Sequence, residues 1–361
     1  MKTISRWLTI CGLFLFSPEV FAQYAFTYQT NGSVIALTGY TGTPVSITIP
    51  SFVSTIGETA FRYCTSLTSV TIPSNVTTLE EAPFEVCPNL KSVNISEGVV
   101  TIGWYAFAES GLTNVVIPSS VLSISWSSFR ACPNLTNFSV SAENTNYSSL
   151  NGVLYDKSQL SIITYPAGRS GSYTIPSNVT NIATDAFYEC SNLTSVTIPN
   201  GVTSITAGTF LYCTSLTSLI IPGSVTFIGD MTFAGETKLK SYFFAGNAPT
   251  SVGNSYEYNA TAYYLPGSTG WGDFSANTGL PAVLWNPLIQ STGPSFGVSN
   301  NQFGFNITGT ANIPIVVEAC TNLSNPVWTP LQYMTLTSGS VYFSDSQWTN
   351  YPVRYYGIGF P

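Results

Sequence analysis

The stretch IPSNVTNIATDAFYECSNLTSVTIP, residues 175–199, contains one complete period of a repeat. Ile-Pro pairs spaced 23 residues apart mark the same period at Ile49-Pro50 and Ile72-Pro73, and again at Ile198-Pro199 and Ile221-Pro222. Ile95-Ser96 keeps the spacing without the proline, and Ile117-Pro118 comes one residue early. A period of this size predicts a stack of similar coils, and such stacks commonly present binding surfaces.

Each coil combines a strand with a turn. The segment Leu67–Ile72 alternates apolar and polar residues and is rich in β-branched side chains, which predicts a short strand that the following proline ends. The step Gly57–Phe61 suits a helical or 3₁₀ turn. One coil cannot bury its own apolar edge, so stacked coils are expected to form a parallel sheet over a continuous core. The phenylalanine of the step recurs as Phe61, Phe84, Phe107, Phe129, Phe187, Phe210 and Phe233.

Five of the seven cysteines follow this phenylalanine by three residues: Cys64, Cys87, Cys132, Cys190 and Cys213. The favoured interpretation is an internal column of small apolar thiols. Disulfides between Cys64 and Cys87 and between Cys190 and Cys213 are an alternative, because adjacent coils bring the Cα atoms within range. A metal column is disfavoured, since the pattern contains no Cys-x-x-Cys and no histidine. Cys320 lies outside the repeats.

Composition excludes several classes of function. The 361 residues carry a formal net charge of −7, and only 7% of them are charged while 44% are hydrophobic, as in β-rich extracellular proteins. The acidic balance argues against nucleic-acid binding, which needs clustered Lys and Arg. The absence of histidine excludes Ser-His-Asp and Cys-His catalysis and imidazole metal sites. Carboxylate and metal-free chemistry remain open on these grounds. Because the repeat favours a binding scaffold, we expect no enzyme, no cofactor and no metal.

The first 22 residues have the features of a secretion signal. Lys2 and Arg6 precede the apolar run 7–16, which is too short to span a bilayer, and Val20-Phe21-Ala22 offers small residues for cleavage after Ala22. The alternative is a buried N-terminal strand. No other segment is long and apolar enough for a membrane helix, so we expect an exported protein without a membrane span.

The remaining chain is expected to form three parts. Residues 23–45 are predicted to be an N-terminal β cap, and residues 46–287 the solenoid, with a hairpin insert at about 141–176 that folds out from the stack around an Asn-Gly turn. Residues 288–361 are predicted to form a small all-β sandwich, since short strand patterns alternate with turn residues there. Trp271 is interpreted as a plug of the solenoid's end, with a ligand platform as the alternative.

The repeat resembles the BspA-like, or Treponema-type, leucine-rich repeat. Residues 176–196 match its pattern closely, through Val179, Ile182, Ala186-Phe187, Cys190 and Leu193. The resemblance covers about residues 45–244 and implies a curved solenoid with few helices, short helical or 3₁₀ turns and a parallel sheet on the concave side. It also implies a secreted or cell-surface protein of adhesive type. The chain departs from the pattern at residues 80–83, where Pro83 adjoins Phe84, and at residues 125–128.

The C-terminal part resembles a short β module of many exported bacterial proteins. The shared elements are Thr-Asn-Leu at 321–323, Trp-x-Pro-Leu at 328–331 and Phe-x-Asp at 343–345. Such a module displays or exports the solenoid, or binds sugar. Trp328 and Trp348 are interpreted as core residues, with sugar stacking as the alternative.

Function is expected on the outward positions of the concave sheet, which are rich in hydroxyl and amide groups. The candidate binding residues are Thr68, Ser69, Thr71, Asn94, Asn114, Asn137, Thr194, Ser195, Thr197, Ser218, Ile220 and Phe243. The leading hypothesis is an adhesion or recognition module for a protein or polysaccharide. A structural surface spacer without a ligand is the first alternative, since Thr and Ser suit exposed strands in any case. A glycan-active enzyme is disfavoured, because Glu80, Glu81, Glu85, Glu97 and Asp185 lie scattered along the turns instead of facing each other.

Overall fold

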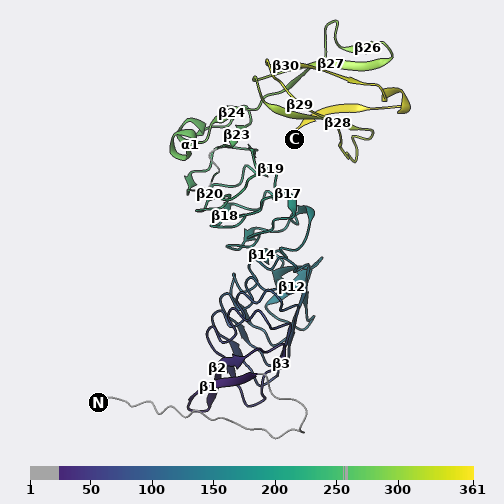
Figure 1. Ribbon diagram of the computed structural model, residues 1–361. Coiled ribbons are helices and arrows are strands. Elements are labelled where there is room, and N and C mark those ends of the chain that lie inside the picture. Colours follow the sequence, from purple (N-terminus) through teal and green to yellow (C-terminus); the bar gives the residue numbers. More distant parts are fainter. Residues whose placement is uncertain (1–23, 255, 257–258) are drawn as a thin grey trace. The chain divides into compact units, whose positions relative to one another are not determined.

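The computed structural model describes residues 24–254, 256 and 259–361, so the predicted signal peptide, residues 1–22, lies outside the described residues (Figure 1). The chain forms two compact units. Unit 1 contains the described residues up to Leu216 together with 227–238 and the described part of 251–257. Unit 2 contains residues 217–226, 239–250 and the described residues from 259 onward. Each unit has its own hydrophobic core.

Unit 1 is a stack of coils, as the repeat predicts. One strand per coil pairs in parallel with that of a neighbouring coil, in three separate groups, and like residues lie in register, as Ser46, Ser69 and Ser92 do. These strands are β3 (Ser46–Thr48), β5 (Ser69–Ile72), β7 (Ser92–Ile95), β9 (Asn114–Ile117), β11 (Asn137–Val140), β15 (Gly171–Thr174) and β17 (Leu193–Thr197). Their alternate residues, such as Val70 and Ile72, are buried, which confirms the predicted strand pattern.

A second row of two-residue strands lies on another side of each coil. Their apolar members, such as Ile56, Leu79 and Ile102, are completely buried and complete the core. The strands are β4 (Thr55–Ile56), β6 (Thr78–Leu79), β8 (Thr101–Ile102), β10 (Ser123–Ile124), β16 (Asn181–Ile182), β18 (Ser204–Ile205), β20 (Phe227–Ile228) and β22 (Ser251–Val252). β4, β6, β8 and β10 form one parallel run, and β18, β20 and β22 form another.

The phenylalanine column forms a stack of parallel rings. The centroids of Phe61 and Phe84 are 5.1 Å apart with an interplanar angle of 4°, and Phe84 and Phe107 are 5.3 Å apart at 3°. After the insert the stack resumes, with Phe187 and Phe210 5.1 Å apart. Identical coils impose this parallel geometry, because each ring repeats its neighbour's position one coil further along.

The turns around these rings are not the helical or 3₁₀ turns expected. Residues two positions before and after the phenylalanine adopt the left-handed conformation, for example Thr59 with φ 55° and Tyr63 with φ 61°. The left-handed residues break the helical path. Thr59, Phe61 and Tyr63 instead donate their N–H groups to carbonyls of the next coil, at 2.7–3.0 Å. The N–H groups between them keep local turn bonds, as Arg62 does to the carbonyl of Thr59 at 3.0 Å, so intercoil and local hydrogen bonds alternate along the turn.

The six described cysteines are free and buried, so the disulfide alternative is wrong for this structure. The thiol of Cys87 donates to the carbonyl of Phe61 at 3.1 Å, and Cys132 and Cys213 make the same bond one coil back, to Phe107 and Phe187. Burial raises the pKa of Cys87 to about 12 and that of Cys132 to about 11. Among the described residues, no group of three or more Cys, Asp or Glu could hold a metal ion.

An antiparallel hairpin of β1 (Tyr24–Asn31) and β2 (Val34–Gly42) lies at the start of unit 1. β2 pairs in parallel with β4, so the hairpin continues the second row of strands beyond the first coil. The ring of Tyr40 stacks on Phe61 at 5.3 Å and an angle of 12°, which covers the end of the phenylalanine column.

The insert is part of the stack and does not fold out from it. β12 (Tyr147–Leu150) and β13 (Val153–Asp156) form a hairpin around Asn151 and Gly152, which have φ angles of 49° and 79°. β14 (Ser161–Thr164) pairs antiparallel with β13 and parallel with β16. Residues Val153, Leu154 and Tyr155 are fully buried. The expectation of a protruding hairpin is therefore wrong, because this apolar run completes the core between two coils.

Unit 2 begins with further solenoid strands. β19 (Ser218–Ile221), β21 (Ser241–Phe244), β23 (Thr261–Tyr264) and β24 (Ala282–Leu284) pair in parallel in this order. Helix α1 (Trp271–Thr278) lies between the last two strands. Trp271 is 5% exposed and stacks on Tyr264 at 4.9 Å, which confirms that it is a plug and not a platform.

The rest of unit 2 consists of two antiparallel sheets, as predicted for the C-terminal segment. The first contains β25 (Leu288–Gln290), β26 (Gly297–Ser299), β27 (Gln302–Thr308) and β30 (Ser340–Asp345). The second contains β28 (Pro314–Cys320), β29 (Thr329–Thr335) and β31 (Tyr355–Gly359). The 3₁₀ helix η1 (Trp348–Asn350) lies in the connection between β30 and β31. Phe305, Ile307, Ile315 and Val317 from the two sheets share one core.

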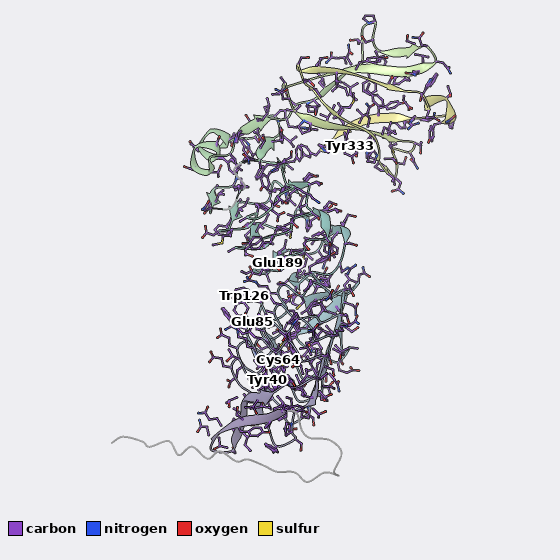
Figure 2. All side chains as sticks on the ribbon, in the orientation of Figure 1. Tyr40, Cys64, Glu85, Trp126, Glu189 and Tyr333 are labelled. Carbon is purple, nitrogen blue, oxygen red and sulfur yellow. The ribbon has the colours of Figure 1, made fainter. Side chains whose placement is uncertain are left out.

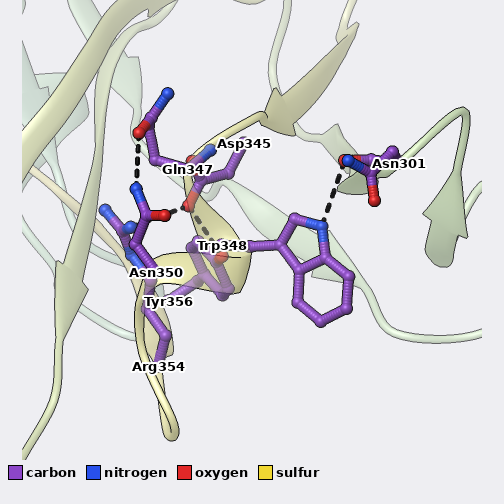
Figure 3. Close-up of polar contacts among 7 residues, drawn as sticks. All are labelled: Asn301, Asp345, Gln347, Trp348, Asn350, Arg354 and Tyr356. Carbon is purple, nitrogen blue, oxygen red and sulfur yellow. Dashed lines mark hydrogen bonds and ion pairs between the residues drawn. The ribbon is translucent and has the colours of Figure 1, made fainter.

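The Phe-x-Asp element links these sheets through the buried carboxylate of Asp345 (Figure 3). Arg354 forms an ion pair with this carboxylate at 3.2 Å, and the hydroxyl of Tyr356 donates to it at 2.9 Å. The indole of Trp348 donates to the carbonyl of Asn301 at 3.3 Å, and Trp328 packs over Gly357. Trp348 is half-buried and Trp328 is 38% exposed, so both pack at the surface of the sheets and the expectation that they are core residues is wrong.

Candidate binding surface

The strand face of unit 1 is the outward surface of β3, β5, β7, β9, β11, β15 and β17. Of the candidate residues on it, four are exposed and five are half-buried. The exposed ones are Asn94, Asn114, Thr194 and Thr197, and the half-buried ones are Thr68, Ser69, Thr71, Asn137 and Ser195. Because paired strands are in register, these side chains form short rows within each group of strands, as Thr71 with Asn94 and Asn114 with Asn137.

Some polar side chains of the strand face form hydrogen bonds to the neighbouring coil. The hydroxyl of Thr68 donates to the carbonyl of Val45 at 2.9 Å, and Thr113 and Thr136 donate in the same way to the preceding coil. The hydroxyls of Ser46 and Ser69 are 2.7 Å apart. Thr68 and Ser69 therefore have partners within the protein, and their sequence position alone does not make them ligand contacts.

The row nearest the prolines is the more open part of the face. Thr48, Thr71 and Asn94 follow one another in register, as do Val116 and Ser139 on β9 and β11. Val116 is 59% exposed, so an apolar side chain lies among the polar ones. A ligand of mixed polarity matches this row better than an ion does.

Sequence reasoning missed four residues of the face. Ser46 and Thr48 on β3, and Ser172 and Thr174 on β15, are all exposed and lie in register with candidate residues such as Ser195 and Thr197. The signal was present, because the pairs Ile49-Pro50 and Ile175-Pro176 follow these strands as in the other coils. The insert hid the second strand, since it places β15 outside the regular spacing.

The tip of the insert hairpin adds a cation next to β11. The carbonyl of Gly152 accepts the N–H of Phe138 at 2.9 Å, and the guanidinium of Arg169 donates to the carbonyl of Asn151. The hydroxyls of Tyr155 and Tyr173 are 2.5 Å apart, and burial raises the pKa of both phenols. Both phenols therefore remain protonated at neutral pH, and the side chains of Asn137 and Arg169 both lie against Gly152.

Unit 2 carries the other three candidates. Ile220 is 42% exposed and Ser218 is half-buried. Phe243 is 0% exposed, so its interpretation as an outward binding residue is wrong. Its ring lies 5.1 Å from Tyr263 and 4.6 Å from Phe360 of the C-terminal part, which covers it.

A separate depression of about 410 Å³ lies beside the N-terminal hairpin. Its wall combines β1 and β2 with the turns of the first coils: Gln29, Asn31, Val34, Ala36, Thr38, Gly57, Glu58 and Glu80. The carboxylate of Glu80 accepts the N–H of Glu58 at 3.0 Å and so already has a partner in the protein. None of the predicted binding residues lines this depression.

Stacked coils with parallel strands on one side and a second row of short strands on another define a solenoid. Its repeated core leucines are fully buried, which makes it a leucine-rich repeat: Leu67, Leu90, Leu112, Leu135, Leu193 and Leu216. The chain belongs to the BspA type leucine rich repeat family. The family's repeat-region model matches residues 40–160 and 169–262 in six copies.

Comparison with one solved structure supports the fold. A leucine-rich repeat protein from Eubacterium ventriosum is 25% identical, with a TM-score of 0.54, and the match covers 72% of this chain and 82% of that one. A leucine-rich repeat protein from Bacteroides ovatus is 21% identical over 74% of this chain and 76% of that one, with a TM-score of 0.47. The comparison with curated proteins found no match. No helix in the described part of the chain is long and apolar enough to cross a membrane.

Proposed function

We propose that this protein is an exported or cell-surface recognition module that binds a protein or a polysaccharide along the strand face. The observation that carries the proposal is the register of exposed groups on that face. On paired strands Asn94 lies in register with Thr71, Asn114 with Asn137, and Thr197 with Thr174, so their amide and hydroxyl groups are held in short rows. A ligand that meets such a surface loses little further entropy in ordering the protein.

A structural spacer without a ligand is the second candidate. It is favoured by the hydroxyls of Thr68, Thr113 and Thr136, which bond to the neighbouring coil and so need no ligand to explain their presence. The two candidates make different predictions. If the protein is only a spacer, a charge placed on the strand face does not affect the capture of any molecule.

We propose no catalytic role. The carboxylates considered for glycan chemistry have structural partners, as Glu85 has in Arg62 at 2.5 Å and Asp185 in Arg130 at 3.3 Å. Glu97 accepts three hydrogen bonds from Ser119 and Ser120. Paired glycosidase carboxylates instead face one another across the bond to be cleaved.

The experiment is a glycan array and a surface-protein pull-down with residues 23–361. The variant Ser195→Asp places a charge on the strand face, and Ser191→Asp places the same charge on the exposed turn just before β17. We expect Ser195→Asp to abolish capture and Ser191→Asp to leave it unchanged. Capture that survives both substitutions, or no capture by the wild type, contradicts the proposal, and the latter result favours the spacer.

The remaining sequence-based assignments stay proposals. We propose export with cleavage after Ala22, and domain limits of 23–45 for the N-terminal cap, 46–287 for the solenoid and 288–361 for the C-terminal module. N-terminal sequencing of the protein secreted by its native host tests the first assignment, and limited proteolysis tests the second, with cuts expected near residue 287.

A further inference from the structure

The turns of unit 1 carry a row of aromatic side chains that neither the stack nor the strand face requires. We define the aromatic belt as Trp104, Tyr105, Trp126, Arg130, Tyr188 and Tyr212. Trp104 is 48% exposed and Tyr212 is 46% exposed. Figure 2 labels Trp126, which belongs to the belt, and Glu189, which follows Tyr188 in the chain.

The belt is continuous along the turns. The rings of Trp104 and Trp126 are 5.0 Å apart at 62°, and Trp104 and Tyr105 are 6.5 Å apart. The guanidinium of Arg130 lies 5.8 Å from the ring of Tyr105 and 3.6 Å from that of Tyr188. Tyr188 in turn meets Tyr212 at 5.9 Å, edge to face. Aromatic and cationic groups are thus linked from one end of the belt to the other.

Packing does not explain the two tryptophans. They occupy the position three residues before the core phenylalanine, which other coils fill with Glu58, Glu81, Thr184, Ala207 and Asp230. Those coils have the same fold, so the stack tolerates small or charged side chains here. An exposed indole on such a position has a cost in solubility, and exposed aromatic patches commonly mark sites of interaction.

Charged groups border the rings and restrict the chemistry of the occupant. Asp185 pairs with Arg130 at 3.3 Å, and Glu109 and Glu189 are exposed on the same turns. A purely apolar partner would leave these carboxylates buried without water, and a polyanion would be repelled by them. A sugar has an apolar face of C–H groups and an edge of hydroxyls, which matches aromatic rings bordered by carboxylates and a guanidinium.

We propose that the aromatic belt is a second ligand site, which binds a neutral oligosaccharide chain running along the turns. Trp104 supplies the main stacking surface, Trp126 forms a wall at an angle to it, and Arg130 and the bordering carboxylates bond the sugar hydroxyls. The site is separate from the strand face, whose residues lie on β3 to β17 and not on the turns.

The test uses residues 23–361 and four probes: cellohexaose, xylohexaose, mannohexaose and chitohexaose. Isothermal titration calorimetry is expected to detect binding of at least one of them. Trp104→Ala should weaken that binding at least about tenfold, as truncation of a central aromatic does. Trp104→Phe, which keeps a ring, should restore most of it. Tyr63→Ala is the matched control, because Tyr63 is 60% exposed on the turn of an earlier coil outside the belt, and it should change nothing.

Hydroxyl-radical footprinting of the wild type provides a measurement that needs no variant. Bound oligosaccharide should protect Trp104 from oxidation and leave Tyr63 unprotected. Ser195→Asp should leave oligosaccharide binding intact, which separates this proposal from that for the strand face. The proposal is overturned if no probe binds, if Tyr63→Ala and Trp104→Ala weaken binding equally, or if Trp104→Ala abolishes capture of a protein and of no sugar.

Discussion

The ring of Phe243 on strand β21 lies 4.6 Å from the ring of Phe360, which follows the last strand of the chain. Trp285 completes the contact at 4.3 Å from Phe360. Through these rings the C-terminal sheets cover an outward position of the solenoid's own sheet. The C-terminal part of unit 2 therefore protects an apolar patch that the repeat pattern alone would leave in water.

Removing this cover should destabilise unit 2. We expect Phe360→Ala to lower the free energy of unfolding by about 2 kcal/mol, since the ring is only partly buried and full burial accounts for roughly 3–5 kcal/mol. Urea unfolding followed by tryptophan fluorescence measures the effect. Tyr355→Ala, which removes a ring that is 39% exposed on the same stretch, should cost much less. Equal losses in the two variants would show that Phe360 has no special role.

The phenylalanine column should be the main support of unit 1. Phe84 is fully buried between Phe61 and Phe107, so Phe84→Ala should cost about 4 kcal/mol through lost burial and a residual cavity. Phe84→Leu should cost clearly less, because it refills most of the space. Urea unfolding measured by circular dichroism checks both. The interpretation fails if the two substitutions have the same effect.

The thiol column should stay reduced and unreactive in the folded protein. The six described cysteines are buried, and burial raises the pKa of Cys87 to about 12. Because the thiolate is the reactive form, we expect no rapid reaction with a disulfide reagent between pH 7 and pH 9, and full reaction in guanidinium chloride. Thr65→Cys, which introduces an exposed thiol next to Cys64, is the positive control and should react at once. A protein mass lower than that of the fully reduced chain, by two hydrogens for each pair of cysteines, would instead reveal disulfides.

Glu97 should make stability depend on pH in the acid range. Hydrogen bonds from the backbone and side chain of Ser119 lower the pKa of its carboxyl below the ordinary value of 4.5. A lowered pKa in the folded state stabilises the protein above the unfolded value, and this contribution disappears as the pH falls through the folded value. Wild type should therefore exceed Glu97→Gln in melting temperature at pH 7, and the difference should shrink below about pH 4.5. A difference that stays constant from pH 7 to pH 3 would contradict this assignment.

The solenoid was predictable because its determinants are local and repeated. The spacing between Ile49-Pro50 and Ile72-Pro73 gives the length of one coil. The alternation of apolar and polar residues within Leu67–Ile72 predicts which side chains point inward. The turn conformation was not predictable, because Thr59 and Tyr63 have left-handed φ angles and donate hydrogen bonds to carbonyls of the next coil. Most of the strand-face candidates do lie on one surface, whereas the hidden coil ending at Ile175-Pro176 required the structure to reveal Ser172 and Thr174 as members of it.

Sequence by itself determined the coil, its length and its inward residues, since these depend on contacts between neighbours one period apart. Only the tertiary structure decided which outward residues meet solvent. Phe243 is buried because Phe360 and Trp285 arrive from a distant part of the chain. The insert joins the core because Val153, Leu154 and Tyr155 fill the space between two coils. The burial of a side chain depends on every segment that packs against it. The sequence pattern therefore predicts which side of a strand a residue faces, but not whether a distant segment covers that side.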